Sequence, residues 1–412
     1  MTGDTEAAGR KPAGRRGWEI LGIVGGALFV CLAVIFIWVS VVAGRKYGEL
    51  DARCRVSIEG ARARDPLRPV LLGTAEPGNA CEDYALAFKE LKKTKDFAKL
   101  ALIVERHPKA DLEFGKSALA EQGRALELLS RGARRSGSKW EYRWEDGSGM
   151  ELPGLLASHH LASLGVLRGR SLAEGGKPRE AAGILLDIAQ MGRDIGSDGP
   201  MICEMIGIAL LDQSFREIRD LLVAGSFDTD SLADLDAGLA VLDDNYMSHA
   251  RILANEAMLM SVSMRDEGGR ARWVFGKMLC VDGAERMDRA LDRMAKAESL
   301  PWAEARKEMD AVVEEGRSSW NPVARIALPG LGGSSDVVRE RQAQLRLLRT
   351  AVRFKRTGEI LELDDPLGSK LHVSRTGGAL KVWSSGRDGV DDGGTGGWQA
   401  KSKDIVLELP PK

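Results

Sequence analysis

Residues 20–43 read ILGIVGGALFVCLAVIFIWVSVVA, a run of 24 residues without a charged side chain. A helix of this length rises about 36 Å at about 1.5 Å per residue. That length exceeds the hydrocarbon core of a bilayer, which is about 30 Å thick. The sequence therefore predicts one transmembrane helix at residues 18–43, preceded by a short tail at residues 1–17.

The charges that flank this run do not choose its orientation. Arg15 and Arg16 precede it, and Arg45 and Lys46 follow it, so the positive-inside rule gives no preference. A short basic tail, one apolar helix and a large C-terminal region are typical of a signal anchor. We therefore expect a single-pass membrane protein whose bulk lies outside the cytoplasm, in the cell envelope. The alternative is a signal peptide cut before Gly44, although signal h-regions are only about 7 to 15 residues long.

Two residue pairs in the N-terminal region have more than one interpretation. Gly22 and Gly26 have the GxxxG spacing that lets two membrane helices pack closely, which predicts a homodimer; glycine is also common in membrane helices without this role. Cys54 and Cys81 flank a segment rich in Pro and Gly, at residues 65–78. They form either a disulfide that closes this loop or two buried free thiols.

The region after the anchor has the composition of a soluble, mainly helical protein. It contains most of the 59 Lys and Arg and 60 Asp and Glu residues, which nearly cancel, so we expect no strong attraction to nucleic acid. After a linker at residues 44–78, apolar residues recur at helical spacing through residues 79–329, which predicts an all-α domain. Within it, the turn at residues 175–177 followed by Pro178 predicts a helical hairpin.

The C-terminal segment, residues 330–412, changes from a helical to a strand pattern. A helix is expected at residues 336–355, and the alternation of apolar and polar residues then predicts strands at residues 370–374, 379–383 and 404–409. The predicted fold class is therefore mainly α: one transmembrane helix, an all-α domain of helical hairpins, and a small C-terminal α+β module with three short antiparallel strands.

A loop rich in Asp and Gly lies between the last two predicted strands and suggests a calcium site. Calcium binds six to eight oxygen atoms, commonly from carboxylates and backbone carbonyls of a loop that glycine allows to turn tightly. The loop contains Asp388, Asp391 and Asp392, and Asp404 follows it directly before the last strand. The alternative is a solvated turn, because Asp and Gly are also the usual residues of long hairpin loops.

The order of motifs in this segment resembles the C-terminal β-region of the major pseudopilins of type II secretion. The similar residues are Asp-Pro-Leu-Gly at 365–368, Trp-Ser-Ser-Gly-Arg-Asp-Gly at 383–389, and Asp-Ile at 404–405. The resemblance implies a structural calcium ion held by the carboxylates of Asp388 and Asp404 and the backbone carbonyl of Ser385. Asp391 and Asp392 are further candidate ligands from this sequence alone. The whole layout also resembles bacterial membrane-anchored helical proteins to which no activity is assigned.

No catalytic motif stands out, and three functional hypotheses follow. The leading one is a non-enzymatic, membrane-anchored protein that docks or scaffolds another protein and carries a structural calcium loop. The second is a membrane-tethered hydrolase that uses carboxylates of the helical domain, such as Glu256 or Glu314. The third is a subunit of a secretion or pilus-like assembly, for which we would expect cleavage after Gly17.

Overall fold

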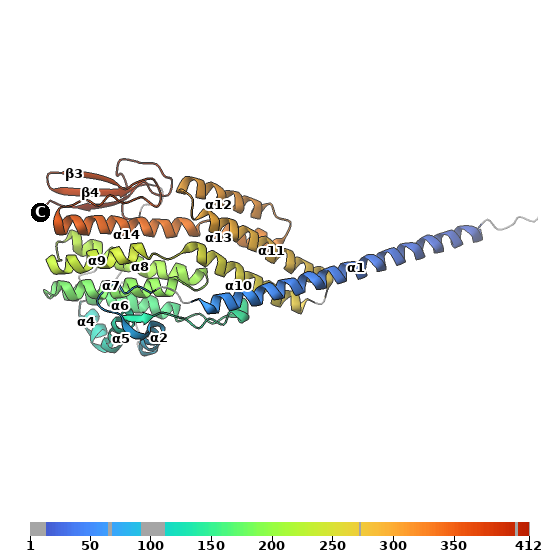
Figure 1. The fold of residues 1–412 in the computed structure, drawn as a ribbon, viewed down its shortest axis with the longest axis horizontal. Helices are drawn as coiled ribbons and strands as arrows, with labels where there is room; N and C mark the ends of the chain where they lie inside the picture. The colour runs from blue at the N-terminus through green and yellow to red at the C-terminus, as the bar shows by residue number, and fades with distance from the viewer. Residues whose placement is uncertain (1–13, 65–67, 92–111, 272, 400–402, 412) are drawn as a thin grey trace, which may run out of the picture.

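The computed structural model describes residues 14–64, 68–91, 112–271, 273–399 and 403–411, with side chains described from residue 31 onward except at residues 112–116. The predicted mainly α fold is confirmed: helices form most of the described chain, and a small antiparallel sheet follows the last helix (Figure 1). The helices and strands are α1 (Gly14–Ala63), β1 (Glu76–Asn79), α2 (Ala80–Leu91), α4 (Leu112–Glu121), α5 (Gly123–Ala133), β2 (Arg135–Gly137), the 3-10 helix η2 (Trp144–Gly149), α6 (Leu155–Glu174), α7 (Pro178–Gly196), α8 (Met201–Val223), α9 (Thr229–Asp244), α10 (His249–Arg270), α11 (Val274–Ala297), α12 (Trp302–Arg317), α13 (Pro322–Leu331), α14 (Ser334–Thr357), β3 (His372–Thr376), β4 (Ala379–Ser384) and β5 (Ile405–Leu409).

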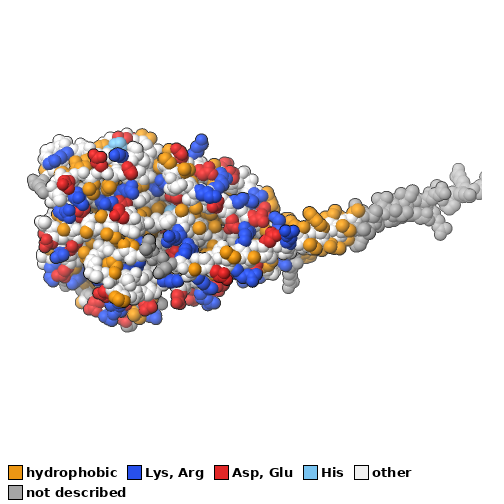
Figure 2. Space-filling model, viewed as in Figure 1, with side chains coloured by type: hydrophobic (Ala, Val, Ile, Leu, Met, Phe, Trp, Pro, Cys, Tyr) orange, Lys and Arg blue, Asp and Glu red, His pale blue; other side chains and the backbone are white. Residues whose placement is uncertain are grey.

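Helix α1 extends well beyond the predicted anchor. It runs without a break from Gly14 to Ala63, so much of the region expected to be a linker is helical. Leu50, Cys54 and Ile58 recur at a spacing of four and are buried, because this stripe packs against α10 and α11. The first part of the helix projects from the body, and hydrophobic side chains cover its described surface (Figure 2). Among the described residues, α1 is the one helix long and apolar enough to cross a membrane.

The body is built around α7, which is buried along almost its whole length between α6, α8 and α9. The predicted hairpin of α6 and α7 is confirmed: Gly176 has a left-handed φ of 72°, and Pro178 occupies the first turn of α7. Helices α7 and α8 cross at Gly192 and Gly207. A Cβ atom at Gly207 would collide with the backbone carbonyl of Gly192, so glycine is required for this close approach.

The three predicted C-terminal strands are confirmed and form an antiparallel sheet in the order β3-β4-β5. Gly377 and Gly378 both have positive φ angles, which the tight turn between β3 and β4 requires. The sheet packs on α14, and α14 in turn packs against α8 and α9 (Figure 1). The expected boundary at residues 329–330 falls inside α13, and α14 packs into the body through α8 and α9.

The two N-terminal residue pairs have different outcomes. Cys54 and Cys81 are both free thiols and both buried, which is the second of the two interpretations. Burial raises the pKa of the Cys54 thiol to about 11, so the thiol stays protonated at neutral pH. Gly22 and Gly26 lie in the part of α1 whose side-chain surroundings are outside the described residues, and the homodimer stays a prediction.

Candidate functional site

Asp404 is the buried anchor of the C-terminal loop. It immediately precedes β5, and its carboxylate is fully buried. The backbone N–H of Asp392 donates to one carboxylate oxygen at 3.3 Å, and the N–H of Gly394 donates to the other at 2.7 Å. Gly394 has a left-handed φ of 74°, which lets the loop turn back onto this carboxylate. Asp404 therefore fixes the loop through hydrogen bonds to its backbone.

Asp391 lies on the exposed side of the same loop. Its Oδ1 accepts hydrogen bonds from the indole N–H of Trp383 at 2.8 Å and from the backbone N–H of Gly393 at 2.9 Å. These two hydrogen bonds hold the pKa of the Asp391 carboxyl below its usual value. His372 stacks on Trp383 and places its Nδ1 atom 3.3 Å from the other Asp391 oxygen. The carboxylate is thus already surrounded by donors.

Asp388 and Ser385, two further predicted ligands, have hydrogen-bond partners of their own. Asp388 is exposed, and its Oδ1 accepts a hydrogen bond from the N–H of Val390 at 3.1 Å. Ser385 is buried, and its N–H donates to Asp365 at 2.9 Å. Across the part of the chain that the structure describes, no three His, Cys, Asp or Glu side chains converge on a point where they could hold a metal ion. In this arrangement the loop places the Asp404 carboxylate against the backbone N–H groups of Asp392 and Gly394.

Asp365 has a structural role that the sequence did not reveal. Its buried carboxylate accepts hydrogen bonds from the N–H of Leu367, the hydroxyl of Ser384 and the N–H of Ser385, at 2.8–3.0 Å. Burial raises the pKa of this carboxyl, although the three hydrogen bonds oppose the shift. Asp365 therefore joins the start of the sheet to the end of β4. The only available signal was its place directly before Pro366, at the opening of the strand region.

The loop is also tied to the helical body. The guanidinium of Arg387 donates from Nε to Glu340 of α14 at 2.7 Å. The backbone carbonyl of Arg387 accepts hydrogen bonds from the indole N–H of Trp302 at 3.1 Å and from Arg306 at 2.6 Å, both on α12. These contacts place the Asp-rich loop at the junction of α12 and α14.

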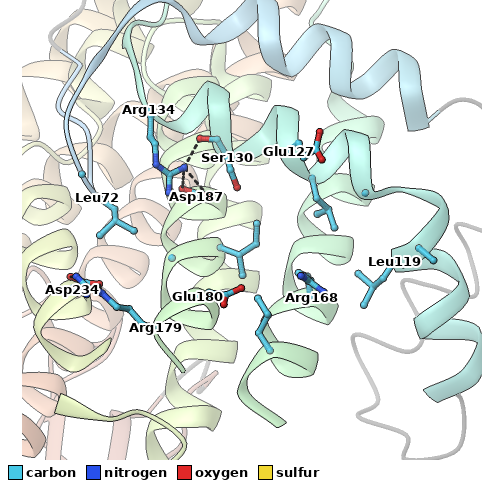
Figure 3. A pocket seen from close by; sticks show the side chains of 17 residues that line it. Leu72, Leu119, Glu127, Ser130, Arg134, Arg168, Arg179, Glu180, Asp187 and Asp234 are labelled. Carbon is cyan, nitrogen blue, oxygen red and sulfur yellow. Dashed lines mark hydrogen bonds and ion pairs between the residues drawn. The ribbon is translucent and has the colours of Figure 1, made fainter. Parts of the chain in front are cut away.

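A separate cleft lies between α5, α6 and α7, with α4, α9 and residues 72–73 at its rim (Figure 3). Its volume is about 1150 Å³, and its lining combines apolar side chains with charged groups of both signs. Asp187 of α7 is the buried carboxyl at this cleft, 3.4 Å from Arg134. Burial raises the pKa of Asp187 to about 6, against the opposing effect of Arg134 and Ser130. The sequence signal was a single acid within the otherwise apolar run at residues 181–189.

The other acids of the cleft have partners of their own. Asp234 accepts from Arg179 at 2.7 Å, and Glu180 pairs with Lys177 at 2.9 Å. Hydrolysis by paired carboxyls needs a general acid and a second carboxylate as base or nucleophile. The cleft thus offers one carboxyl with a raised pKa, Asp187.

Glu256 and Glu314, the two acids named for the hydrolase hypothesis, lie elsewhere. Glu256 is buried and accepts a hydrogen bond from the N–H of Met201 at 3.0 Å, so it caps the start of α8. Glu314 forms a salt bridge with Arg317 on the exposed face of α12. Both positions have structural explanations, and neither lines the cleft.

The segment at residues 68–72 leads to the rim of the cleft and is held by a buried network of hydrogen bonds. The side chain of Arg68 is almost completely buried, and it donates to Asp194 of α7 at 2.7 Å. The hydroxyl of Tyr84 donates to the same carboxylate at 3.0 Å, and the amide of Gln190 donates to its other oxygen at 3.0 Å. Gln190 also accepts from the N–H of Leu71. This network fixes residues 68–72 against α7.

A buried series of hydrogen bonds joins Ser334, His249 and Glu204 and superficially matches a hydrolase triad. The His249 Nδ1 atom is 2.7 Å from Glu204, and its Nε2 atom is 3.1 Å from the Ser334 hydroxyl. Ser334 donates its one proton to the carbonyl of Leu331 at 2.8 Å, so it must accept from His249. With this pattern of hydrogen bonds the imidazole donates from both nitrogens, which is its charged form. Burial lowers the pKa of His249, but the hydrogen bond and charge of Glu204 outweigh this effect and raise it overall. A charged His that already donates to the serine is no general base for it.

Comparison of the chain with protein-family models, with curated proteins and with solved structures found no match.

Proposed function

We propose that this protein is a membrane-anchored scaffold that holds its helical body at a fixed position beside a bilayer. The single observation that carries the proposal is the continuity of α1, which passes from an exposed apolar segment into the core of the body without a break. Leu32, Ile35 and Ile37 are exposed in the projecting segment, whereas Leu50 is completely buried. An exposed apolar helix of this length is explained if lipid surrounds it.

The base of the helix is firmly docked. Leu50, Cys54 and Ile58 are buried against α10 and α11. Burying an aliphatic side chain of the size of Leu50 or Ile58 stabilises by about 1.5–3 kcal/mol. Outside this stripe, Arg53 pairs with Asp288 at 3.1 Å, and the Tyr47 hydroxyl donates to the carbonyl of Arg265 at 2.8 Å. The anchor and the body therefore move as one unit.

The cleft lies at the end of the body opposite to the projecting part of α1, where α4, α5 and α6 meet (Figure 1). A partner could reach it without interference from the membrane. Its mixture of apolar side chains with Arg168, Glu127 and Glu180 suits a polypeptide surface better than a small uncharged ligand. This placement supports docking of a protein partner, and we assign the body to the extracytoplasmic side on the signal-anchor arrangement.

Extraction of membranes with alkaline carbonate tests the anchor on the full chain. The wild-type protein should stay in the membrane pellet, and the Ile35→Arg, Ile37→Arg variant should be released, since each arginine costs about 2.5–3.5 kcal/mol at the centre of a membrane helix. Leu156→Arg is the matched control, because Leu156 is an equally exposed apolar residue on α6. Release of the wild-type protein by carbonate would overturn the proposal.

Calcium binding by the C-terminal loop is a second, separate proposal. It is supported by the oxygen-rich composition of the loop and by the approach of Asp404 to the backbone beside Asp391 and Asp392. The donors would be the carboxylates of Asp388 and Asp404 and the backbone carbonyl of Ser385, with Asp391 or Asp392 added. The bound ion would make the loop more rigid. Binding requires Asp404 to exchange backbone N–H partners for the ion, so we expect the loop to rearrange on binding.

A further inference from the structure

The turn between α10 and α11 presents two large apolar side chains to solvent. Trp273 is 79% exposed and Phe275 is 71% exposed. Such exposure of two neighbouring aromatic residues is unusual for a soluble surface and marks a contact with a partner or a membrane. The direction in which this turn points decides which of the two applies.

Contacts with α1 give the direction of both helices. Asn255 near the start of α10 accepts from Arg64, whereas Arg265 near its end meets Tyr47, so α10 runs antiparallel to α1. Helix α11 runs parallel to α1, because the ammonium of Lys277 lies 5.7 Å from the ring centre of Tyr47 and Asp288 pairs with Arg53 further along. The turn that joins the two helices therefore points along α1 toward its apolar segment.

The position of the turn along the axis of α1, here called its level, follows from helical geometry. Tyr47 is four residues beyond Ala43, the last residue of the uncharged run, a distance of about 6 Å at about 1.5 Å per residue. Trp273 precedes Lys277 by the same number of residues, so it lies about 6 Å nearer the apolar segment, level with Ala43. Ala43 is only 2% exposed, although the segment before it is largely exposed. The body thus contacts one face of the last turn of the apolar run, at Ala43, while Val41 on another face stays exposed.

The chemistry at this level suits the headgroup region of a bilayer. Tryptophan concentrates there because its ring is apolar and its indole N–H can still reach water or lipid oxygen atoms. Arg45, Lys46 and Arg270 are exposed cationic groups near the same level, and each also pairs with an acidic side chain of the protein. Such side chains extend toward lipid phosphates while their stems contact apolar surface.

We propose that the α10–α11 turn is a second membrane contact, with Trp273 and Phe275 inserted in the headgroup layer of the bilayer that α1 crosses. This inference rests on the proposed anchoring role of α1. With a second contact beside the helix, the body cannot tilt freely on its anchor. The orientation of the cleft relative to the membrane is then fixed at two points.

Fluorescence quenching by brominated lipid tests the proposal on the full chain in phosphatidylcholine vesicles that are brominated near the top of the acyl chains. We expect Trp273→Phe to lose part of the quenched emission relative to the wild-type protein, and Trp38→Phe in α1 to lose another part. Trp383→Phe is the control, since β4 lies at the end of the body far from the projecting part of α1 (Figure 1). Its removal should leave the quenched emission unchanged.

The outcomes separate this inference from the anchoring proposal. A loss for Trp38→Phe without a loss for Trp273→Phe would overturn the second contact and leave the anchor intact. No loss for either variant would overturn both. A loss for Trp383→Phe equal to that for Trp273→Phe would also overturn the inference, because the quenching would then not depend on the level of the turn. The melting temperature of Trp273→Phe should match that of the wild-type protein, because the side chain is exposed.

Discussion

Replacement of Asp194 by asparagine tests whether the buried network that holds residues 68–72 is essential to the body. The Asp194 carboxylate accepts hydrogen bonds from Arg68, Tyr84 and Gln190, and it is the charge partner of a guanidinium whose side chain is only 1% exposed. A neutral amide in place of this carboxylate would leave the guanidinium buried without a counter-charge. Breaking a buried ion pair in this way costs about 3–5 kcal/mol.

The expected loss is a large share of the stability of an ordinary domain, about 5–15 kcal/mol. Urea unfolding of the full chain in detergent, followed by circular dichroism, measures it as a lower midpoint at an unchanged slope. Asp234→Asn is the matched control, because its partner Arg179 is largely exposed and water screens the attraction of such a pair, so its loss should change the midpoint little.

A second variant distinguishes the loss of the counter-charge from a general packing defect. Arg68→Met, Asp194→Asn removes both charges and should recover part of the stability lost in Asp194→Asn. It should not recover all of it, since Arg68 also donates to the backbone carbonyls of Gly132 and Ala133. A loss for Asp194→Asn no larger than that for Asp234→Asn would refute the reasoning.

Three further outcomes follow from the structure. Because burial raises the pKa of Asp187 to about 6, the folded state keeps this proton to a higher pH than the unfolded state, and the contribution of Asp187 to stability should be lost as the pH rises from about 4 to about 6; urea unfolding at a series of pH values should show the difference in stability between the wild-type protein and Asp187→Asn changing over this range. Added calcium should raise the melting temperature of the wild-type protein, an increase that chelator reverses and Asp388→Ala abolishes; no response would refute the calcium loop. Gly207→Ala should destabilise the body by about 1–3 kcal/mol or more, since the new methyl group meets the backbone of α7, whereas Gly60→Ala, with open space around it, should not destabilise.

The long apolar helix was predictable because an uncharged run of 24 residues favours one continuous helix, but its continuation to Ala63 was not. Gly44 and Gly48 follow the run and suggest a break, and the segment before Cys81 contains several turn-forming residues. The stripe of Leu50, Cys54 and Ile58 is a helical signal in the same region. The helix continues through this region because α10 and α11 provide a surface on which the stripe is buried. This tertiary contact is not visible in the local sequence.

The C-terminal strands were predictable because their signals are local. Alternating side chains and the paired glycines at 377–378 specify a hairpin whatever surrounds it. The site was less accessible to sequence reasoning. Asp365 meets Ser384, nineteen residues away, and Asp187 faces Arg134 on another helix. Such pairings depend on long-range packing, which the spacing of residues along the chain does not report.

The most direct test of the central claim is the intact mass of the protein recovered from the membrane fraction and from the soluble fraction of cells that express the full chain. An anchor predicts a chain that retains residues 20–43 and stays in the membrane fraction. A soluble chain that begins at Gly44 would contradict the claim, because α1 would then be a signal sequence that is removed. A membrane-bound chain that begins at Trp18 would instead support an assembly subunit processed after Gly17.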